Sequence, residues 1–428
     1  MTPEVRDRID QIRQGIVPEG YKKTESGIIP NEWRVEQVSK CIEEYKFFSN
    51  DISHIPVYSS SRKGLVPQSD YYNQREAVET NLGYKVVPQG YVTYRHMSDD
   101  DVFHFNINKT GENVLVSSEY PVFTSSDNCD LSFLISVLNN TARFRYFCKM
   151  QKLGGTRTRL YLDNLKRYAL ALPPFDEQKK IAEILSTQDK AIELQERKIE
   201  ELKRFKKGCL EKMFPRKGQK VPETRFPGFT DDWEQRKLSD LAEKTYGGGT
   251  PTTSNEAYWN GDIPWIQSSD VVDGKLLGVE PRKWITQGGL NNSAAQLIPE
   301  NSIAIITRVG VGKLAFMPYS YATSQDFLSL SKLNVEPFFA VYACYKKLQS
   351  ELNAVQGTSI KGITKDELLA KSIMVPRYAE QQQIGAFFKQ LDKLITLHQR
   401  KLDEMKKQKK ALMQLLLTGI VKTKGEVR

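Results

Sequence analysis

The sequence lacks the cysteine pairs from which disulfide frameworks and structural zinc sites are built. Its five cysteines are scattered, with no C-x-x-C pair, so neither kind of cross-link is indicated. The four histidines show no H-x-x-x-H spacing, which argues against a metal site. No stretch approaches the ~18 apolar residues of a membrane helix, and Met1–Asp10 is charged, without an apolar signal core. These absences predict a cytoplasmic protein with no bound metal and no membrane partner.

Motifs for catalysis are also missing. Gly310-x-Gly312-Lys313 is not a phosphate-binding loop, because Thr307 replaces the first glycine of that motif and Leu314 its final Ser or Thr. Leu172–Phe175 is similar to the N-P-P-F motif of adenine-N6 methyltransferases, but leucine replaces the polar residue that accepts a hydrogen bond from the adenine amine. This segment and its later copy, Val375–Tyr378, instead favour a rigid start to a long helix. The sequence therefore predicts a chain that is not an enzyme.

Basic residues, in contrast, are in excess. The 428 residues include 62 Lys and Arg against 52 Asp and Glu, a formal charge of +10, which favours a polyanionic partner. At roughly 150 residues per domain, the length suggests about three structural units.

An internal repeat is the strongest signal in the sequence. Pro173, Glu177, Gln178 and Ile181 return 203 residues later, and the register then holds without a gap from Asp189 to Lys207. The returning residues include Pro376, Glu380, Gln381, Ile384, Asp392 and Lys410. A Gly-Thr segment precedes each copy, in Gly154–Arg159 and Gly357–Lys361, and a fainter repeat at an offset of 200 pairs Trp33 with Trp233. The chain is therefore a tandem duplication.

Each repeated tail is predicted to form one long helix, since no Gly or Pro interrupts it from Asp176 to Lys207 or from Ala386 to Thr418. Apolar residues follow a heptad in both copies, at Ile181, Leu185, Ile192, Ile199, Leu202 and Met213, and at Ile384, Phe388, Leu391, Ile395, Leu402, Met405, Leu412 and Leu416. Two such helices are expected to pair antiparallel about a pseudo-two-fold axis. Polar residues interrupt the apolar seam at Gln188, Gln195, Lys206, His398 and Lys409. They either fix the helix register or are merely solvated.

Between the repeats lie two inserts, at about 45–150 and about 245–350, that do not align with each other. Both are rich in short strand-like runs, such as Tyr84–Val87 and Ser302–Ile306. Their loops carry Arg and Lys beside Gly and aromatic residues. Because Arg can bond guanine bidentately and Lys can bind phosphate, these loops hold residue types that base recognition needs. A single surface arginine is more often solvated than bound, so the prediction depends on the set.

These features carry a resemblance to a known family. The segments Leu172–Ile181 and Met374–Ile384 resemble the P-P-x-x-E-Q-x-x-I motif that opens each long helix in specificity subunits of type I restriction-modification systems, although Arg377 replaces the second proline. Gly247–Pro251, followed by Trp259–Ile266, resembles the start of a target-recognition domain in that family. In the first insert Gly64–Pro67, Tyr71-Tyr72 and Tyr84–Val87 are similar to another subtype of this domain.

The resemblance extends over nearly the whole chain and implies an α/β (α+β) fold. Two α/β target-recognition domains would be joined by two long antiparallel coiled-coil helices that act as a ruler. The expected segments are an N-terminal extension (1–30), the first recognition domain (31–172), a long helix and linker (173–225), the second recognition domain (226–375) and a final long helix (376–428). Met1–Gly27 has no counterpart in the second half, and we expect it to form a helix that packs on a partner.

The implied function is recognition of a bipartite site in double-stranded DNA. Two modification subunits would methylate adenine with S-adenosylmethionine, and restriction subunits would translocate DNA with ATP and Mg, so no cofactor is expected in this chain. The candidate DNA-binding residues are Arg62, Lys63, Tyr72, Arg95, Arg157, Arg159, Thr250, Trp259, Gln267, Ser268, Arg308 and Lys313. One alternative is a coiled-coil adapter that does not recognise DNA. A free-standing methyltransferase is a second alternative, but the sequence lacks its catalytic motif.

Overall fold

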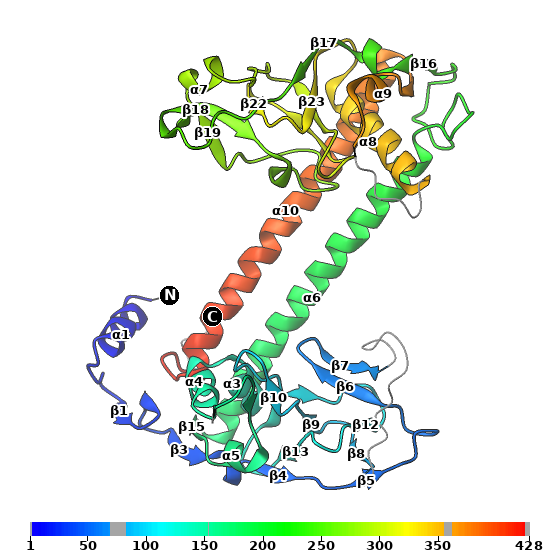
Figure 1. The fold of residues 1–428 in the computed structure, drawn as a ribbon. Coiled ribbons are helices and arrows are strands. Elements are labelled where there is room, and N and C mark those ends of the chain that lie inside the picture. Colours follow the sequence, from blue (N-terminus) through cyan, green and yellow to red (C-terminus); the bar gives the residue numbers. More distant parts are fainter. Residues whose placement is uncertain (1, 69–82, 153, 355–361, 424–428) are drawn as a thin grey trace. The chain divides into compact units, whose positions relative to one another are not determined.

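The computed structural model describes residues 2–68, 83–152, 154–354 and 362–423 (Figure 1). The chain divides into two compact units. Unit 1 comprises Met1–Glu193 with Asp403–Arg428, and unit 2 comprises Leu194–Leu402. Two long helices, α6 (Phe175–Lys212) and α10 (Tyr378–Leu417), each contribute one part to each unit.

Unit 1 combines several small sheets with short helices. Its strands are β1 (Tyr21–Thr24), β2 (Gly27–Pro30), β3 (Arg34–Gln37), β4 (Ile42–Glu44), β5 (Phe48–Ser49), β6 (Tyr58–Ser61), β7 (Gly64–Pro67), β8 (Tyr84–Val87), β9 (Val92–Thr93), β10 (Met97–Ser98), β11 (Asn106–Ile107), β12 (Val114–Val116), β13 (Val122–Ser125), β14 (Thr158–Arg159) and β15 (Ala169–Leu172). Its shorter helices are α1 (Pro3–Arg13), α3 (Leu131–Asn140), α4 (Ala142–Lys149), α5 (Leu162–Lys166) and the 3-10 helix η1 (Val38–Lys40).

Unit 2 has a similar composition. Its strands are β16 (Glu234–Lys237), β17 (Ala242–Gly247), β18 (Trp259–Ile266), β19 (Lys283–Ile285), β20 (Ser302–Ile306), β21 (Leu314–Met317), β22 (Ala322–Thr323), β23 (Phe327–Leu333) and β24 (Ser372–Val375). Its shorter helices are α7 (Gln287–Asn291), α8 (Pro337–Ala354), α9 (Lys365–Leu369) and the 3-10 helices η2 (Leu238–Leu241), η3 (Glu256–Tyr258) and η4 (Ser268–Asp270). All five residues of β20 are buried, which agrees with its run of apolar side chains.

The main sheets of the two units have the same topology. The strand order is β11-β9-β13-β4 in unit 1 and β21-β20-β23-β17 in unit 2, and every neighbouring pair is antiparallel. In both sheets the first strand of the chain lies at an edge, beside the last one, and a helix follows: α3 in unit 1 and α8 in unit 2. The two inserts therefore share a sheet topology although their sequences do not align.

The strand pairs that flank these sheets have the same register in both units. Strand β3 pairs antiparallel with β15, matching Gln37 with Ala169, and β16 pairs in the same way with β24, matching Lys237 with Ser372. Helices α5 and α9 occupy the same place in the repeat, just before β15 and β24. The predicted tandem duplication is confirmed.

The glutamine of the repeated Glu-Gln motif anchors the start of each long helix, which begins directly after Pro174 in α6 and two residues after Pro376 in α10. The Gln178 amide is buried, donates to the Pro173 carbonyl at 2.9 Å, and accepts from the backbone N–H of Asp130 at 2.8 Å. Gln381 makes the same two bonds, to the Pro376 carbonyl at 2.8 Å and from the N–H of Glu336 at 2.9 Å. Each glutamine thus ties a long helix to the helix that follows the main sheet.

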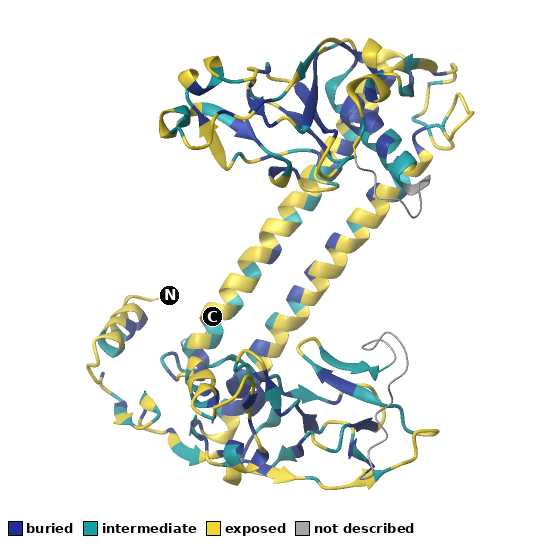
Figure 2. Ribbon diagram, viewed as in Figure 1, coloured by how far each residue is buried: buried dark blue, intermediate teal, exposed yellow. Residues whose placement is uncertain are grey.

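The long helices pair antiparallel. In unit 1 Ile181 and Leu185, near the start of α6, share a core with Leu416 near the end of α10. In unit 2 the end of α6, with Met213, the residue after it, packs with Phe388 near the start of α10. None of the predicted heptad positions is exposed, while the remaining surface of the helices is largely open (Figure 2).

Four of the five predicted polar residues in the seam have partners. Within unit 2 the Gln195 amide lies 2.8 Å from His398 Nδ1 and donates to the His398 carbonyl at 2.8 Å. Lys206 pairs with Asp392 at 2.5 Å. Within unit 1 the equivalent Lys409 pairs with Asp189. These specific pairings favour a role in fixing register over simple solvation.

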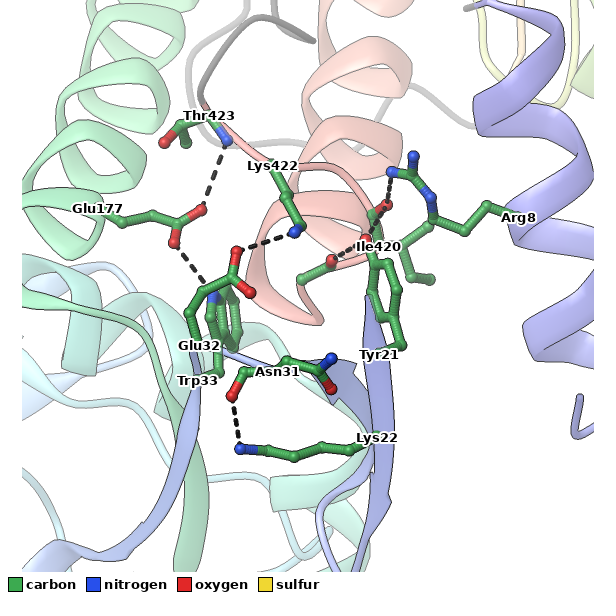
Figure 3. Close-up of polar contacts among 11 residues, drawn as sticks. Arg8, Tyr21, Lys22, Asn31, Glu32, Trp33, Glu177, Ile420, Lys422 and Thr423 are labelled. Atoms are coloured by element: carbon green, nitrogen blue, oxygen red, sulfur yellow. Dashed lines mark hydrogen bonds and ion pairs between the residues drawn. The ribbon is translucent and has the colours of Figure 1, made fainter. Parts of the chain in front are cut away.

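The N-terminal extension packs on the C-terminal segment of the same unit (Figure 3). Helix α1 is present as expected, and its buried Val5 belongs to the core that contains Leu416. The Arg8 guanidinium donates to the Ile420 carbonyl at 3.0 Å, and the Tyr21 hydroxyl donates to the Gly419 carbonyl at 3.0 Å. Two apolar residues of α1, Val5 and Ile9, are therefore buried within this chain. That the extension packs on a partner stays a prediction.

Candidate nucleic-acid interface

Five of the predicted basic residues gather around one cavity in unit 1. Arg62 and Lys63 form the turn between β6 and β7, and Arg95 follows β9. All three line a cavity of about 460 Å³. Arg157 and Arg159 approach it from β14, because Arg159 pairs with Met97, which also lines the cavity. The structure thus brings together residues that lie up to 97 positions apart in the sequence.

Two of these arginines are paired with carboxylates from one short segment. Asp99 accepts from Arg157 Nε at 2.8 Å, and Asp100 lies 2.6 Å from Arg62 Nη2. Although desolvation acts in the opposite direction, the bond from Arg62 lowers the pKa of Asp100. Lys63, Arg95 and Arg159 form no ion pair with any residue that the structure describes.

The segment that carries the carboxylates, Ser98–Val102, has a fixed shape. Asp101 adopts a left-handed backbone conformation with φ +61°, and its carboxylate accepts from the Thr158 hydroxyl. The Ser98 hydroxyl donates to Asp100 at 2.9 Å and accepts from the N–H of Val102 at 3.1 Å. These bonds hold Asp99 and Asp100 in place beside the cavity.

Two histidines in this region were not predicted as site residues. His104 lines the cavity. His96 is buried and stacks on Tyr161 at 5.5 Å, and its Nδ1 has no hydrogen-bond partner among the described residues. Burial lowers the pKa of His96, which therefore favours the neutral ring. The sequence signal that could have marked the region is the run of three aspartates so close to Arg95.

In unit 2 the predicted residues converge on the loop Ser324–Asp326 between β22 and β23. The Thr250 hydroxyl donates to the Gln325 side chain at 2.6 Å, and the Ser268 hydroxyl donates to the Asp326 carboxylate at 3.1 Å. Thr307, next to Arg308, donates from its hydroxyl to the Asp326 carbonyl at 3.0 Å. Three distant segments therefore meet at one loop.

Arg308 and Lys313 flank the connection from β20 to β21. Arg308 is exposed and Lys313 is half-buried. Across the described part of the chain, neither side chain forms an ion pair. Both charges are available to a polyanion that approaches this loop.

The two clusters occupy equivalent places in the fold. In unit 1 the N–H of Leu160 donates to the carbonyl of His96, next to Arg95, at 2.8 Å. In unit 2 the N–H of Ile363, 203 positions after Leu160, donates to the carbonyl of Thr307, next to Arg308, at 2.8 Å. The repeated frame thus presents a different set of basic side chains at the same point in each unit.

The remaining predicted residues of unit 2 have local structural contacts. Trp259 packs edge-on against Trp265 at 5.2 Å, and Trp265 Nε1 donates to the Gly249 carbonyl at 3.0 Å. The backbone N–H of Gln267 donates to Asp270 at 3.0 Å, while its side chain is half-buried. Gly248 is required here because a Cβ atom would lie 1.9 Å from the Ser324 carbonyl oxygen. The glycine-rich motif thus lets the segment before Thr250 approach the loop Ser324–Asp326.

Some predictions fall outside the described residues. Tyr72 and the Gly-Thr segment Gly357–Lys361 both do so. Over the described ranges, no group of three or more His, Cys, Asp or Glu residues is placed to hold a metal ion. Within the same ranges, no helix is long and apolar enough to span a membrane.

Comparison with known proteins gives a consistent result. The family model for the type I restriction modification DNA specificity domain matches residues 39–204 and 230–407. A Methanocaldococcus jannaschii protein, named as an MjaX type I restriction enzyme specificity subunit, is 24% identical over 428 residues, covering 95% of this chain and 97% of the relative. The EcoR124I/EcoR124II specificity subunit of Escherichia coli is 31% identical over 172 residues, 38% of this chain and 41% of its own length.

A solved structure shares the fold. The S subunit of a type I restriction-modification system from M. genitalium matches with a TM-score of 0.53 at 13% identity. The match covers 91% of this chain and 96% of that one.

Proposed function

The chain belongs to the type I restriction-modification DNA specificity family, and from this premise we propose that it recognises a bipartite DNA site, one half through each unit. The observation that carries the proposal is the equivalent position of the two basic clusters. His96 and Thr307 lie at corresponding places after strands β9 and β20 of sheets with the same topology. Arg95 directly precedes the first and Arg308 directly follows the second, and the surrounding side chains differ. One frame that presents two different surfaces suits the recognition of two different half-sites.

The chain supplies recognition, and its partners supply chemistry. Two modification subunits methylate adenine with S-adenosylmethionine, and restriction subunits translocate and cut DNA with ATP and Mg. This chain contributes arginine, lysine and hydroxyl side chains, which bind phosphates and base edges. Its own cluster carboxylates, Asp99, Asp100 and Asp326, are engaged with this chain's own side chains.

The long helices set the spacing between the half-sites. Helix α6 has 38 residues and α10 has 40, so at ~1.5 Å per residue each extends for roughly 60 Å. The seam contacts of Gln195 with His398 and of Lys206 with Asp392 prevent the helices from sliding. A fixed helix pair keeps the distance between half-sites constant.

The test is an exchange of inserts. The chain is produced with its modification subunits, and methylated adenines are mapped by sequencing. Exchanging residues 45–150 for the insert of a relative should change one half-site and leave the other intact. Exchanging 245–350 is the matched control and should change only the other half. A methylation pattern that ignores both exchanges would support the coiled-coil adapter instead.

A further inference from the structure

The arginines around the unit 1 cavity fall into two groups. Arg157 and Arg62 are each held by a carboxylate of the Ser98–Val102 segment, whereas Arg95, Lys63 and Arg159 pair with no described residue. Asp99 occupies Nε of Arg157. No residue that the structure describes bonds the two terminal nitrogens of that guanidinium, which form a planar pair of donors.

We propose that Asp99 is a positioning residue that orients Arg157 to recognise guanine in the first half-site, an inference that rests on the proposed DNA recognition. Asp100 occupies a terminal nitrogen of Arg62, Nη2, so Arg62 does not present the same pair of donors. Guanine presents two acceptors, O6 and N7, to the major groove, and the terminal nitrogens of arginine bond both. A guanidinium whose Nε is already fixed loses less conformational freedom when it makes these bonds.

The pairs are poorly suited to a purely stabilising role. The side chains are exposed by 50% for Arg157 and 66% for Asp99, and by 62% for Arg62 and 47% for Asp100. Exposed ion pairs contribute little to folding. Carboxylates at a DNA-facing surface also repel phosphate, which weakens non-specific binding. Their presence is explained if they improve discrimination between bases rather than affinity.

Arg157 is not part of the repeated sequence, because the second half of the chain has a different residue at this position. The position 203 residues later is Ile360, and in the register of the repeated Gly-Thr pair it is Ser359, so neither alignment places a basic residue there. A residue that differs between two copies of one frame is suited to recognising a half-site that also differs. The unpaired Lys63 and Arg159 are left to bind phosphates, which needs charge but no fixed orientation.

The experiment selects binding sites from DNA duplexes with randomised half-sites, using the full chain in complex with its modification subunits. The wild-type complex should enrich guanine in the first half-site. Arg157→Ala should reduce the preference for guanine at one position by roughly 5- to 150-fold. Asp99→Asn should reduce it at the same position by up to about fivefold. The second half-site and the thermal midpoint should not change. Lys63→Ala is the matched control and should weaken binding to all sequences alike.

Two results would overturn the proposal. The first is an unchanged base preference in Arg157→Ala. The second is an Asp99→Asn complex that binds every sequence more tightly with its guanine preference intact, which would mean that Asp99 only offsets positive charge. Failure of the proposed function is distinct from both, because the wild-type complex would then enrich no split site at all.

Discussion

Replacing Lys206 by alanine should destabilise unit 2 far more than the equivalent change at Lys409 destabilises unit 1. Lys206 and Asp392 are exposed by only 9% and 14%, and the Tyr342 hydroxyl donates to the same carboxylate at 2.6 Å. Removing one partner of such a buried pair leaves an uncompensated charge and costs about 3–5 kcal/mol. Lys409 and its partner Asp189 are exposed by 24% and 59%, so their pair contributes less than about 1 kcal/mol.

The assay is thermal unfolding combined with hydrogen exchange. For a unit of this size, about 3–5 kcal/mol corresponds to a midpoint lower by roughly 6–20 °C. The loss of protection should be confined to α8 and the neighbouring turns of α10. Because a matched apolar set avoids both the buried charge and an unpaired Tyr342 hydroxyl, combining Lys206→Met, Asp392→Leu and Tyr342→Phe should restore most of the stability. Equal midpoint shifts for the Lys206 and Lys409 variants would refute the reasoning.

Three further predictions concern pH, spacing and salt. Burial lowers the pKa of His96 below its usual 6.5, so the unfolded chain binds more protons and the stability of unit 1 should fall as pH drops below about 6.5. His96→Gln should flatten the dependence of melting temperature on pH. If the dependence is unchanged in this variant, another group causes it, for example His104. Inserting four residues after Gln195 lengthens α6 by ~6 Å and rotates the part of the helix beyond the insertion by ~40°. The spacer of the methylated sites should gain one base pair, or two if axial length dominates. An unchanged spacer in an active variant would contradict the idea that the helices measure distance. Arg308 has no ion pair among the described residues, so we expect it to bind a phosphate. Arg308→Ala should then reduce the slope of log K, the DNA association constant, against log salt concentration by about 0.9 for all sequences. A loss of affinity confined to one base position would show instead that Arg308 recognises a base.

The heptad pattern and the internal repeat correctly predicted the long helices and the equivalence of the two halves. The heptad placed Ile181, Leu185 and Phe388 in buried seams, and the repeat gave the equivalence of Gln178 and Gln381. Side-chain periodicity determines these features locally, so a single sequence contains them. The shared topology of the two main sheets was not visible, because strand pairing depends on which faces are buried and different residues can satisfy the same pattern.

Contacts between distant residues were also not predictable. Asp99 and Arg157 are 58 positions apart, and their pairing follows from the match of β10 with β14. Even repeated residues acquire different partners. Trp33 Nε1 donates to Glu177, but the equivalent Glu380 is bound bidentately by Arg225. Trp233 Nε1 is then buried without a partner in the described structure.

The packing of the chain ends has a consequence for synthesis on the ribosome. Unit 2 is continuous in sequence and can fold as soon as Leu402 has emerged, whereas the core of unit 1 joins Trp33 with Leu416 and Val421. At about 5–20 residues per second, the ~200 residues of unit 2 delay that closure by roughly 10–40 s. During this interval the core of unit 1, which supports the basic cluster around its cavity, is incomplete. A chain that stops before Leu416 lacks the apolar side chains that complete this core. Such a truncated product exposes apolar surface to chaperones and proteases.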